Sequence, residues 1–194
     1  MEHPERVPER VIVGISGASG AIYGIRLLEM LAEMGLPSHL VISDAGAVTI
    51  ARETALNRKD VAAKAAVCYK IGDIAAPIAS GSFAAKGMMV APCSIRTMSE
   101  IASGVTSSLL TRAADVTLKE RRPLILMVRE TPLHLGHLRT MTALTEMGAI
   151  IMPPVPAFYT APRSIDDIIE HTVARMLDLF GTPWPHEKRW GETV

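Results

Sequence analysis

The chain has 194 residues, of which 48% are hydrophobic and 4% aromatic, and its two cysteines offer no disulfide framework. Lysine plus arginine and aspartate plus glutamate number 20 each, so no basic excess indicates nucleic acid or an anionic membrane as a partner. The length predicts one domain. Because no leader-like or membrane-spanning apolar run is evident, we expect a cytoplasmic protein.

The mean hydropathy of +0.25 is high for a chain without a membrane span. Exposed apolar patches commonly mark contacts between molecules. We therefore expect part of the apolar surface to be buried between the subunits of a homo-oligomer.

Strands and helices are predicted to alternate after a polar tail over residues 1–9. Short apolar runs predict buried strands at 11–15, 39–43, 88–91, 124–128 and 149–152. Apolar residues three or four apart predict helices at 21–34, 44–53, 61–66, 94–102, 107–118, 134–147 and 164–180. A proline-rich loop over 153–162 precedes the last helix, and a second tail covers 182–194.

Single residues indicate where two of the helices begin and where one strand ends. Asp44 is expected to cap the second helix. Pro92 is expected to end the strand predicted over residues 88–91. Ser164 and Asp167 have the spacing of a capping box, with Asp in place of the usual Glu, and should open the last helix.

The alternation predicts an α/β fold, a single-domain doubly wound parallel sheet of the flavodoxin-like or Rossmann-like three-layer type. The domain is expected to cover residues 10–181, with the tail 182–194 contributing to an oligomer contact or to the active site. Ligands of such sheets bind beyond the carboxyl ends of the strands. This rule gathers four segments at one edge, namely 17–20, Ser43, 93–97 and 129–130.

The turn over residues 16–20 follows a strand and opens a helix, which is the arrangement of an anion site. Gly17 and Gly20 let the backbone approach a ligand, and the free N–H groups of the helix start point toward the turn. The hydroxyls of Ser16 and Ser19 can donate to a phosphate. The glycine spacing is neither GxGxxG nor a Walker loop, so a tight turn without a ligand is the alternative.

Three of these segments can hold a phosphorylated ring cofactor. The turn 17–19 and the segment 92–97 each place hydroxyls and backbone N–H groups at a helix start, and Ser43 ends the neighbouring strand. No Asp or Glu directly ends that strand to hold an adenosine ribose, which disfavours a dinucleotide. A mononucleotide such as FMN fits better.

A second group of side chains is mainly cationic and is spread over two helices and two loops. Its members are Arg112, Lys119, Arg129, Glu130, Tyr159 and Arg175. If they converge, they would surround a dianion such as a phosphate monoester, and Glu130 beside it could act as acid or base. The alternative for the helix cations is ordinary solvated charge.

Two further candidates have simpler explanations. His134 and His137 lie three residues apart without a third ligand of obvious spacing, which favours a helix surface over a metal site. Cys93 could be nucleophilic at a helix start, but a small buried residue is favoured. The sequence predicts no metal site.

In combination, the motifs resemble those of the UbiX-type flavin prenyltransferase family over about residues 10–191. The matching motifs lie at 17–20, 80–82, 92–94 with Thr97, 112–116, 118–123, 129–132, 156–159 and 189–191. The segment Leu-His-Leu-Gly-His-Leu-Arg at 133–139 differs from the common Ser-Ser-Ile-His-Leu-Glu-Asn form. It looks more like the branch paired with phenolic (hydroxyaryl) acid decarboxylases.

The resemblance implies a metal-independent enzyme that joins the dimethylallyl group of dimethylallyl monophosphate to N5 and C6 of reduced FMN. The product, prenylated FMN, would serve a separate UbiD-type decarboxylase, and the enzyme would be a homododecamer. The FMN-binding residues implied by matching positions are Gly17, Ala18, Ser19, Ser43, Ser94, Ile95, Arg96, Thr97 and Arg129. Those implied for the allyl phosphate are Arg112, Lys119, Arg129, Glu130, Tyr159, Arg175 and Trp190. The implied catalytic residues are Ser19, Glu53, Lys119 and Glu130, with Glu53 moving protons near the flavin.

Other functions on the same architecture are left open. One is a non-catalytic FMN carrier or subunit of a hydroxyaryl acid decarboxylase, which would have no need for a second phosphate site. Another is a cysteine-type flavin decarboxylase, which relies on an early His and an Asn-containing motif. Here the one His between Gly20 and Asp60 is His39, inside a predicted strand, and no Pro-x-Met-Asn sequence occurs.

Overall fold

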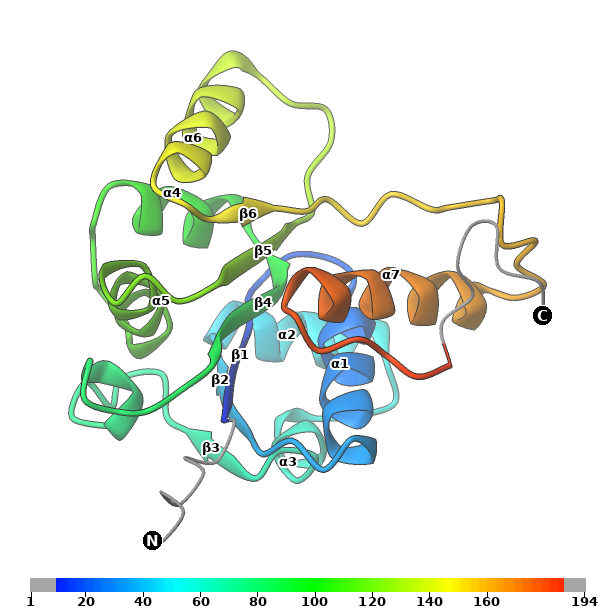
Figure 1. Cartoon of the computed structure of the whole chain (residues 1–194), viewed down its shortest axis with the longest axis horizontal. Coiled ribbons are helices and arrows are strands. Elements are labelled where there is room, and N and C mark those ends of the chain that lie inside the picture. Colours follow the sequence, from blue (N-terminus) through cyan, green and yellow to red (C-terminus); the bar gives the residue numbers. More distant parts are fainter. Residues whose placement is uncertain (1–9, 187–194) are drawn as a thin grey trace, which may run out of the picture.

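The computed structural model describes residues 10–186, in which a six-stranded parallel sheet lies between two layers of helices (Figure 1). The strand order across the sheet is β3-β2-β1-β4-β5-β6. The strands are β1 (Val11–Ile15), β2 (Ser38–Ile42), β3 (Val67–Tyr69), β4 (Gly87–Cys93), β5 (Leu124–Val128) and β6 (Ile150–Ile151). The predicted doubly wound α/β fold is confirmed.

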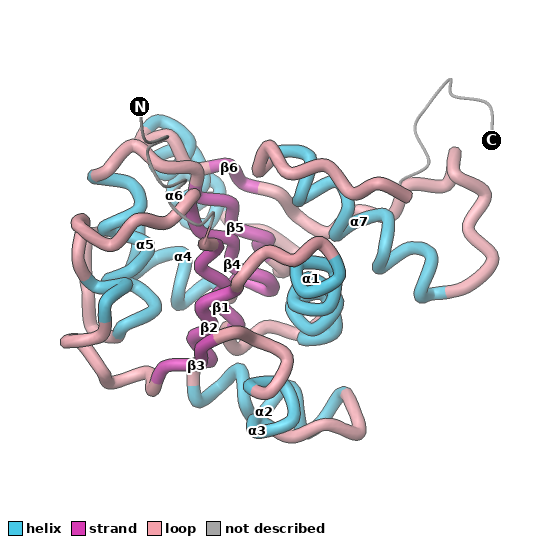
Figure 2. The backbone as a smooth tube through the Cα atoms, turned by 60° about the horizontal axis from the view of Figure 1, so that its bottom comes forward, coloured by secondary structure: helices cyan, strands magenta, loops and turns pink. Residues whose placement is uncertain are grey.

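Helices cover both faces of the sheet (Figure 2). They are α1 (Ala21–Glu33), α2 (Asp44–Glu53), α3 (Arg58–Ala62), α4 (Ile95–Ala102), α5 (Leu109–Lys119), α6 (Leu135–Glu146) and α7 (Ile165–Leu179), with a 3-10 turn η1 (Pro77–Ala79). One core, below α1 and α7, contains Val13 and Met89, whereas the other, below α4, α5 and α6, contains Ile12 and Met88. Successive strand residues thus point to opposite faces and are buried on both, which is why the strands are continuous apolar runs.

The chain leaves β1 toward β2 and β3, and then crosses to β4 on the other side of β1. β1 therefore pairs with both β2 and β4, in parallel. At such a reversal the connections after neighbouring strands run in opposite directions, which opens a crevice at the carboxyl ends of the strands. The crevice beyond β1 and β4 is where the predicted 17–20 and 93–97 segments lie.

Several predicted boundaries are wrong. β4 does not end at Pro92 but continues to Cys93, which pairs with Val128 after a register shift that begins at Val90. Such an irregularity accommodates a residue that has no N–H for the ladder. The strand β3 was not predicted; it is three residues long at the sheet edge, and Val67 is partly exposed. The predicted helix at 61–66 lies earlier, as α3.

Two helices have a different capping residue from the one predicted. Ser43, not Asp44, caps α2, because its hydroxyl accepts from Gly46 N at 2.9 Å. Ser108, not Ser107, caps α5. The predicted capping box of α7, formed by Ser164 and Asp167, is confirmed.

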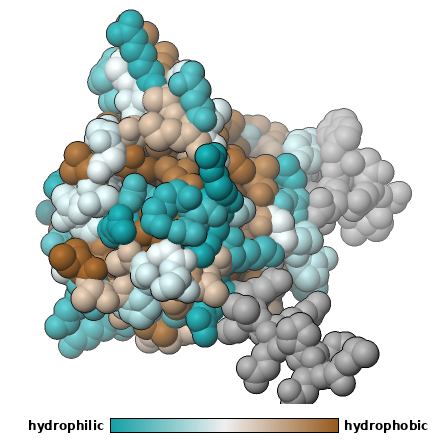
Figure 3. Space-filling view, turned by 60° about the vertical axis from the view of Figure 1, so that its left-hand side comes forward, coloured by the Kyte–Doolittle hydropathy of each residue, from teal (hydrophilic) through white to brown (hydrophobic). Residues whose placement is uncertain are grey.

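Among residues 10–186, no helix is both long and apolar enough to cross a bilayer. Figure 3 views the side of the molecule that carries α4, α5 and α6, and it shows apolar surface exposed between polar groups. Large apolar side chains that are more than a third exposed include Leu135, Leu138, Met147, Val155, Phe158 and Ile165. Trp190 lies outside the described residues.

Candidate functional site

The carboxyl ends of β1 and β4 are joined by the side chain of Ser16. Its hydroxyl donates to Pro92 O at 3.0 Å and accepts from Ser94 N at 2.7 Å, and the residue is fully buried. The sequence suggested that this hydroxyl could donate to a phosphate. That suggestion is wrong for Ser16, because the hydroxyl is directed into the protein and both of its hydrogen-bonding roles are used there.

Glycines allow these segments to pack against each other. A Cβ on Gly17 would lie 2.3 Å from the Cβ of Ala45, and a Cβ on Gly24 would lie 2.2 Å from Ala91 O. Neither position has room for a side chain. The turn after β1 is therefore packed against the start of α2, and α1 is packed against the end of β4.

Beyond these segments lies a hollow of about 320 Å³, which we call the carboxyl-edge hollow. Its lining includes five of the predicted FMN-binding residues, Gly17, Ser43, Ser94, Arg96 and Thr97. The predicted convergence of these residues at one sheet edge is confirmed.

Three helices begin at the carboxyl-edge hollow. The caps of α2, α4 and α5 are Ser43, Ser94 and Ser108, and all three line it. A helix N-terminus carries partial positive charge and unpaired backbone N–H groups, so three of them around one hollow favour an anion. The chemistry of this lining fits a phosphate monoester such as that of FMN.

Charged side chains at the rim are already paired. Arg96 Nε donates to Glu100 Oε1 at 2.8 Å, and Ser107 Oγ donates to Glu100 Oε2 at 2.9 Å. Burial raises the pKa of Glu100, but the hydrogen bonds from Arg96 and Ser107 and the Arg96 charge outweigh burial and hold it below the ordinary value. Neutral hydroxyls and helix ends therefore provide most of the attraction for an anion.

The sequence interpretation missed Ser107 and Ser108 as lining residues. The serine pair before the apolar Leu109 signalled a helix start, but not its position in space. The α4–α5 loop that carries the pair reaches the sheet edge only because α5 packs on the strands.

Glu53 occupies the start of α1. Its Oε2 accepts from Gly20 N at 2.8 Å and from Ala21 N at 3.0 Å. The prediction that these N–H groups are free for a ligand is wrong, since a carboxylate of the chain itself takes them. The candidate donors for an anion are then those at the starts of α2, α4 and α5.

The environment of Glu53 favours its ionised form. Burial raises its pKa, but hydrogen bonds from the Ser19 hydroxyl and from the Gly20 and Ala21 amides, together with the Arg129 charge, outweigh burial and lower it. Arg129 itself follows β5 and donates its backbone N–H to Cys93 O at 3.1 Å. Thus Ser19, Glu53 and Arg129, each predicted to serve the site, form one electrostatic neighbourhood.

Within the chain, Arg112 and Lys119 are separated from Arg175. Arg112 and Lys119 lie on α5, which packs on one face of the sheet, whereas Arg175 lies on α7 against the other face (Figure 2). Arg112 is bound to Asp115 at 2.8 Å, and Lys119 pairs with Glu120. Arg175 is bound to Asp178 at 2.7 Å. One chain alone does not bring these three cations together.

Tyr159 lies on the same side of the sheet as α7. Its hydroxyl is 3.3 Å from His171 Nε2, and the two rings meet edge to face. Glu130 is exposed after β5, where its Oε1 accepts from Thr131 N at 3.0 Å. The proposed roles of both residues stay predictions.

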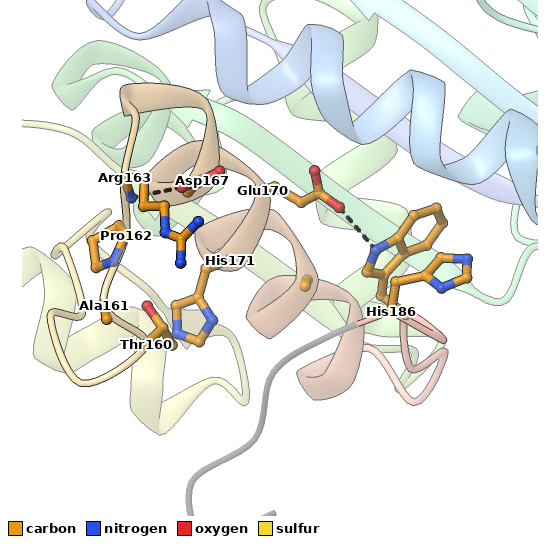
Figure 4. A pocket seen from close by; sticks show the side chains of 10 residues that line it. Thr160, Ala161, Pro162, Arg163, Asp167, Glu170, His171 and His186 are labelled. Carbon is orange, nitrogen blue, oxygen red and sulfur yellow. Dashed lines mark hydrogen bonds between the residues drawn. The ribbon is translucent and has the colours of Figure 1, made fainter. Parts of the chain in front are cut away.

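A second pocket, of about 400 Å³, lies between α7 and the chain after Tyr159 (Figure 4). Arg163 N donates to Asp167 Oδ2 at 2.7 Å, and Trp184 Nε1 donates to Glu170 Oε1 at 3.2 Å. Its lining mixes cationic and anionic side chains. Two carboxylates, Asp167 and Glu170, face it beside one guanidinium, Arg163, whereas three serine-capped helix starts face the carboxyl-edge hollow, so it makes the poorer phosphate site.

The remaining candidates have structural roles. Cys93 is fully buried, and burial raises the pKa of its thiol, so it is the small core residue that was favoured. His134 caps α6 by accepting from His137 N at 3.3 Å. In the described part of the chain, no three metal-ligating side chains come together.

The fold and the carboxyl-edge hollow define the class of protein: a doubly wound α/β protein with a hollow suited to a phosphorylated ligand at the switch point of its sheet. The family model described as "Flavoprotein" matches residues 2–177. A flavin prenyltransferase UbiX of Salmonella typhimurium is 57% identical over 185 residues, which cover 94% of this chain and 98% of the relative.

Two solved structures agree. A crystal structure of AnUbiX (PadA1) in complex with FMN and dimethylallyl pyrophosphate has a TM-score of 0.95 and 46% identity, and covers 97% of this chain and 100% of that chain. A dodecameric FMN-dependent UbiX-like decarboxylase from Escherichia coli has a TM-score of 0.92 and 47% identity, and covers 94% and 100%. The chain belongs to the flavoprotein family and, within it, to the UbiX-type flavin prenyltransferases.

Proposed function

We propose that this chain joins the dimethylallyl group of dimethylallyl phosphate to N5 and C6 of reduced FMN. The observation that carries the proposal is the carboxyl-edge hollow, where three serine-capped helix starts surround one space of about 320 Å³. A relative with the same fold is named as a complex with FMN and dimethylallyl pyrophosphate, which supports both ligands.

FMN would be held mainly by backbone and hydroxyl donors. Ser43, Ser94 and Thr97 line the hollow and would receive its phosphate. The 17–19 turn and Arg129, whose charge acts on Glu53, would contact its ring. Ile95 and Arg96 complete the first turn of α4, whose N-terminus faces the hollow. When bound, reduced FMN supplies the nucleophilic N5 and C6 positions.

The leaving phosphate would be stabilised by side-chain cations. Breaking an allylic C–O bond leaves charge on the phosphate, and nearby Arg, Lys and Tyr groups lower the energy of that charge. We assign this role to Arg112, Lys119, Tyr159 and Arg175, and proton transfer to Glu130. The Glu53 carboxylate, which accepts a hydrogen bond from Ser19, would itself act as a proton acceptor beside the flavin ring.

This assignment requires more than one copy of the chain. Since α5 and α7 cover opposite faces of the sheet, Arg112 and Lys119 would come from one subunit and Tyr159 and Arg175 from another. The exposed apolar side chains Val155, Phe158 and Ile165 beside Tyr159 support a contact at this place. A structure with the same fold is described as dodecameric, which supports a homododecamer here.

We further propose that the product passes to a separate UbiD-type decarboxylase, as the resemblance implies, and that both act in the cytoplasm. A carrier would have no use for the second set of side chains, which we assign to the allyl phosphate. The cysteine-decarboxylase alternative lacks support from His39, which lies in β2 and is bound to Tyr69 OH at 2.8 Å.

The test is an anaerobic reaction of purified protein, reduced FMN and dimethylallyl monophosphate, with the pyrophosphate in a parallel reaction. The mass of the released flavin is then measured. A gain of one dimethylallyl unit supports the proposal, and the faster donor identifies the substrate. Tight binding of unaltered flavin in both reactions would support a carrier and contradict the prenyltransferase.

A further inference from the structure

Residues 15 and 16 connect all three segments predicted to bind FMN. Ile15 O accepts from Ser43 N at 2.9 Å, so the end of β1 fixes the start of α2. Ser16 N donates to Pro92 O at 3.1 Å, and Ser16 leads directly into the turn 17–19. These contacts come from the backbone and do not depend on which side chain is present.

The hydroxyl of Ser16 makes the one link that depends on its side chain. It joins Ser16 to two residues of the 92–97 segment, 76 and 78 positions away, by donating to Pro92 O and accepting from Ser94 N. The bond to Pro92 O is buried and the bond from Ser94 N is partly buried, so a donor or acceptor that loses its partner there is costly. Alanine at this position can provide neither bond.

Ser94 transmits the position of Ser16 into the carboxyl-edge hollow. Ser94 Oγ accepts from Thr97 N at 3.3 Å and donates to Thr97 Oγ1 at 3.1 Å. Ser94 and Thr97 both line the hollow, whereas Ser16 does not. The chain of contacts therefore runs from the buried Ser16 hydroxyl to the first turn of α4.

We propose that Ser16 is a positioning residue for FMN: its buried hydroxyl holds the 17–19 turn and the Ser94–Thr97 turn at the separation that the flavin phosphate and ring require. The proposal rests on the proposed function, since it needs FMN in the hollow. Ser16 acts through Ser94 and has no contact of its own with the ligand space.

The test compares Ser16→Ala with Ser16→Thr in the full chain. FMN affinity is measured by quenching of flavin fluorescence, and the thermal midpoint of the FMN-free protein is measured separately. Ser16→Ala should weaken FMN binding about tenfold, the effect of losing one well-placed buried hydrogen bond. Ser16→Thr keeps the hydroxyl and should restore most of the affinity.

Thr117→Val is the matched control. Thr117 is also buried, and its hydroxyl donates to Ala113 O at 2.7 Å within α5, two turns from the hollow. It should lower the thermal midpoint without changing FMN affinity. If Ser16→Ala behaves in the same way, with wild-type FMN affinity and a lower midpoint, Ser16 is only a stability residue and the inference is overturned.

A double variant tests the route through Ser94. If Ser16 acts by placing the Ser94–Thr97 turn, then Ser16→Ala and Thr97→Val together should weaken FMN binding less than the product of their separate effects. Fully multiplicative effects would contradict the route. Should Ser16→Ala not fold, Ser16→Cys replaces it, because a thiol hydrogen-bonds more weakly and should still reduce affinity.

The outcomes separate this inference from the proposed function. A wild-type protein that binds no FMN contradicts the proposed function itself. A wild-type protein that binds FMN while Ser16→Ala binds it equally well contradicts only the role of Ser16.

Discussion

The carboxylate of Glu53 accepts a hydrogen bond from the backbone N–H of Gly20 at 2.8 Å, although 33 positions separate the two residues. The end of α2 thereby closes the start of α1 and leaves the starts of α2, α4 and α5 to face the carboxyl-edge hollow. Because Glu53 already occupies the start of α1, the helix starts left available to an anion at this edge are those of α2, α4 and α5.

Glu53→Gln should lower the free energy of unfolding by about 0.5 kcal/mol near neutral pH, because a neutral amide interacts less well with the positive end of α1. The folded-state pKa of Glu53 is lowered, so its contribution is complete above the unfolded-state value and is lost as pH falls through the folded-state value. Denaturant unfolding should therefore show the two proteins converging below about pH 4.

Glu146→Gln is the control for this prediction, since Glu146 ends α6, where a negative charge gains nothing from the helix dipole. It should cause no loss of stability. A constant difference between wild type and Glu53→Gln down to pH 3 would show that the Glu53 charge is not the cause.

Glu130→Gln should reduce turnover by about 100-fold, the usual contribution of a general acid or base, while FMN binds as in wild type. Glu130 follows β5 and is exposed, so the fold should tolerate the change. Single-turnover rates under anaerobic conditions and a flavin titration provide the two measurements. A wild-type rate would remove Glu130 from the mechanism.

Lys119→Ala and Arg175→Ala should each raise the concentration of allyl phosphate needed for half-maximal rate. Because the two residues lie on opposite sides of the sheet, mixed oligomers formed by co-expressing both variants should contain some intact sites and recover part of the wild-type rate.

The matched mixture combines Lys119→Ala with Arg112→Ala. Both changes lie on α5, so every α5 in the mixture carries one defect and no recovery is expected. Equal recovery in the two mixtures would contradict the sharing of the site between subunits.

Gly17→Ala should abolish measurable FMN binding and lower the free energy of unfolding by about 1–3 kcal/mol, because the new Cβ would overlap the Cβ of Ala45. Ala45→Gly removes the overlapping atom, so the double variant should regain part of the stability. Calorimetry of the single and double variants gives the result. A single variant as stable as wild type would mean that the turn after β1 is not tightly packed.

The sequence predicts β1 and β5 to the residue, because a strand covered on both faces is a continuous apolar run with clear ends. It fails at β3, a short and partly exposed edge strand whose existence depends on pairing with β2. It also fails at Pro92, where the register shift between β4 and β5 lets the strand continue.

In the site, too, some features follow from the local sequence and others depend on contacts between distant segments. Ser43, Ser94 and Thr97 were predictable as lining residues, since strand order alone brings strand ends together. The inward direction of Ser16 and the occupation of Gly20 N by Glu53 were not, because both depend on contacts between distant segments. Nor could the pattern of charges show that α5 and α7 lie on different faces.

The helix α5 connects two parts of the molecule: its eleven residues, Leu109–Lys119, follow the cap Ser108 at the hollow and extend about 16 Å along the axis. In the proposed assembly, Ser108 at its start lines the flavin hollow of its own subunit, while Arg112 and Lys119 contribute to a phosphate site that a neighbouring subunit completes. A single substitution that tilts α5 would then disturb two reaction centres at once. Selection on one centre would constrain the other, and an isolated subunit would hold two half-sites rather than one complete enzyme.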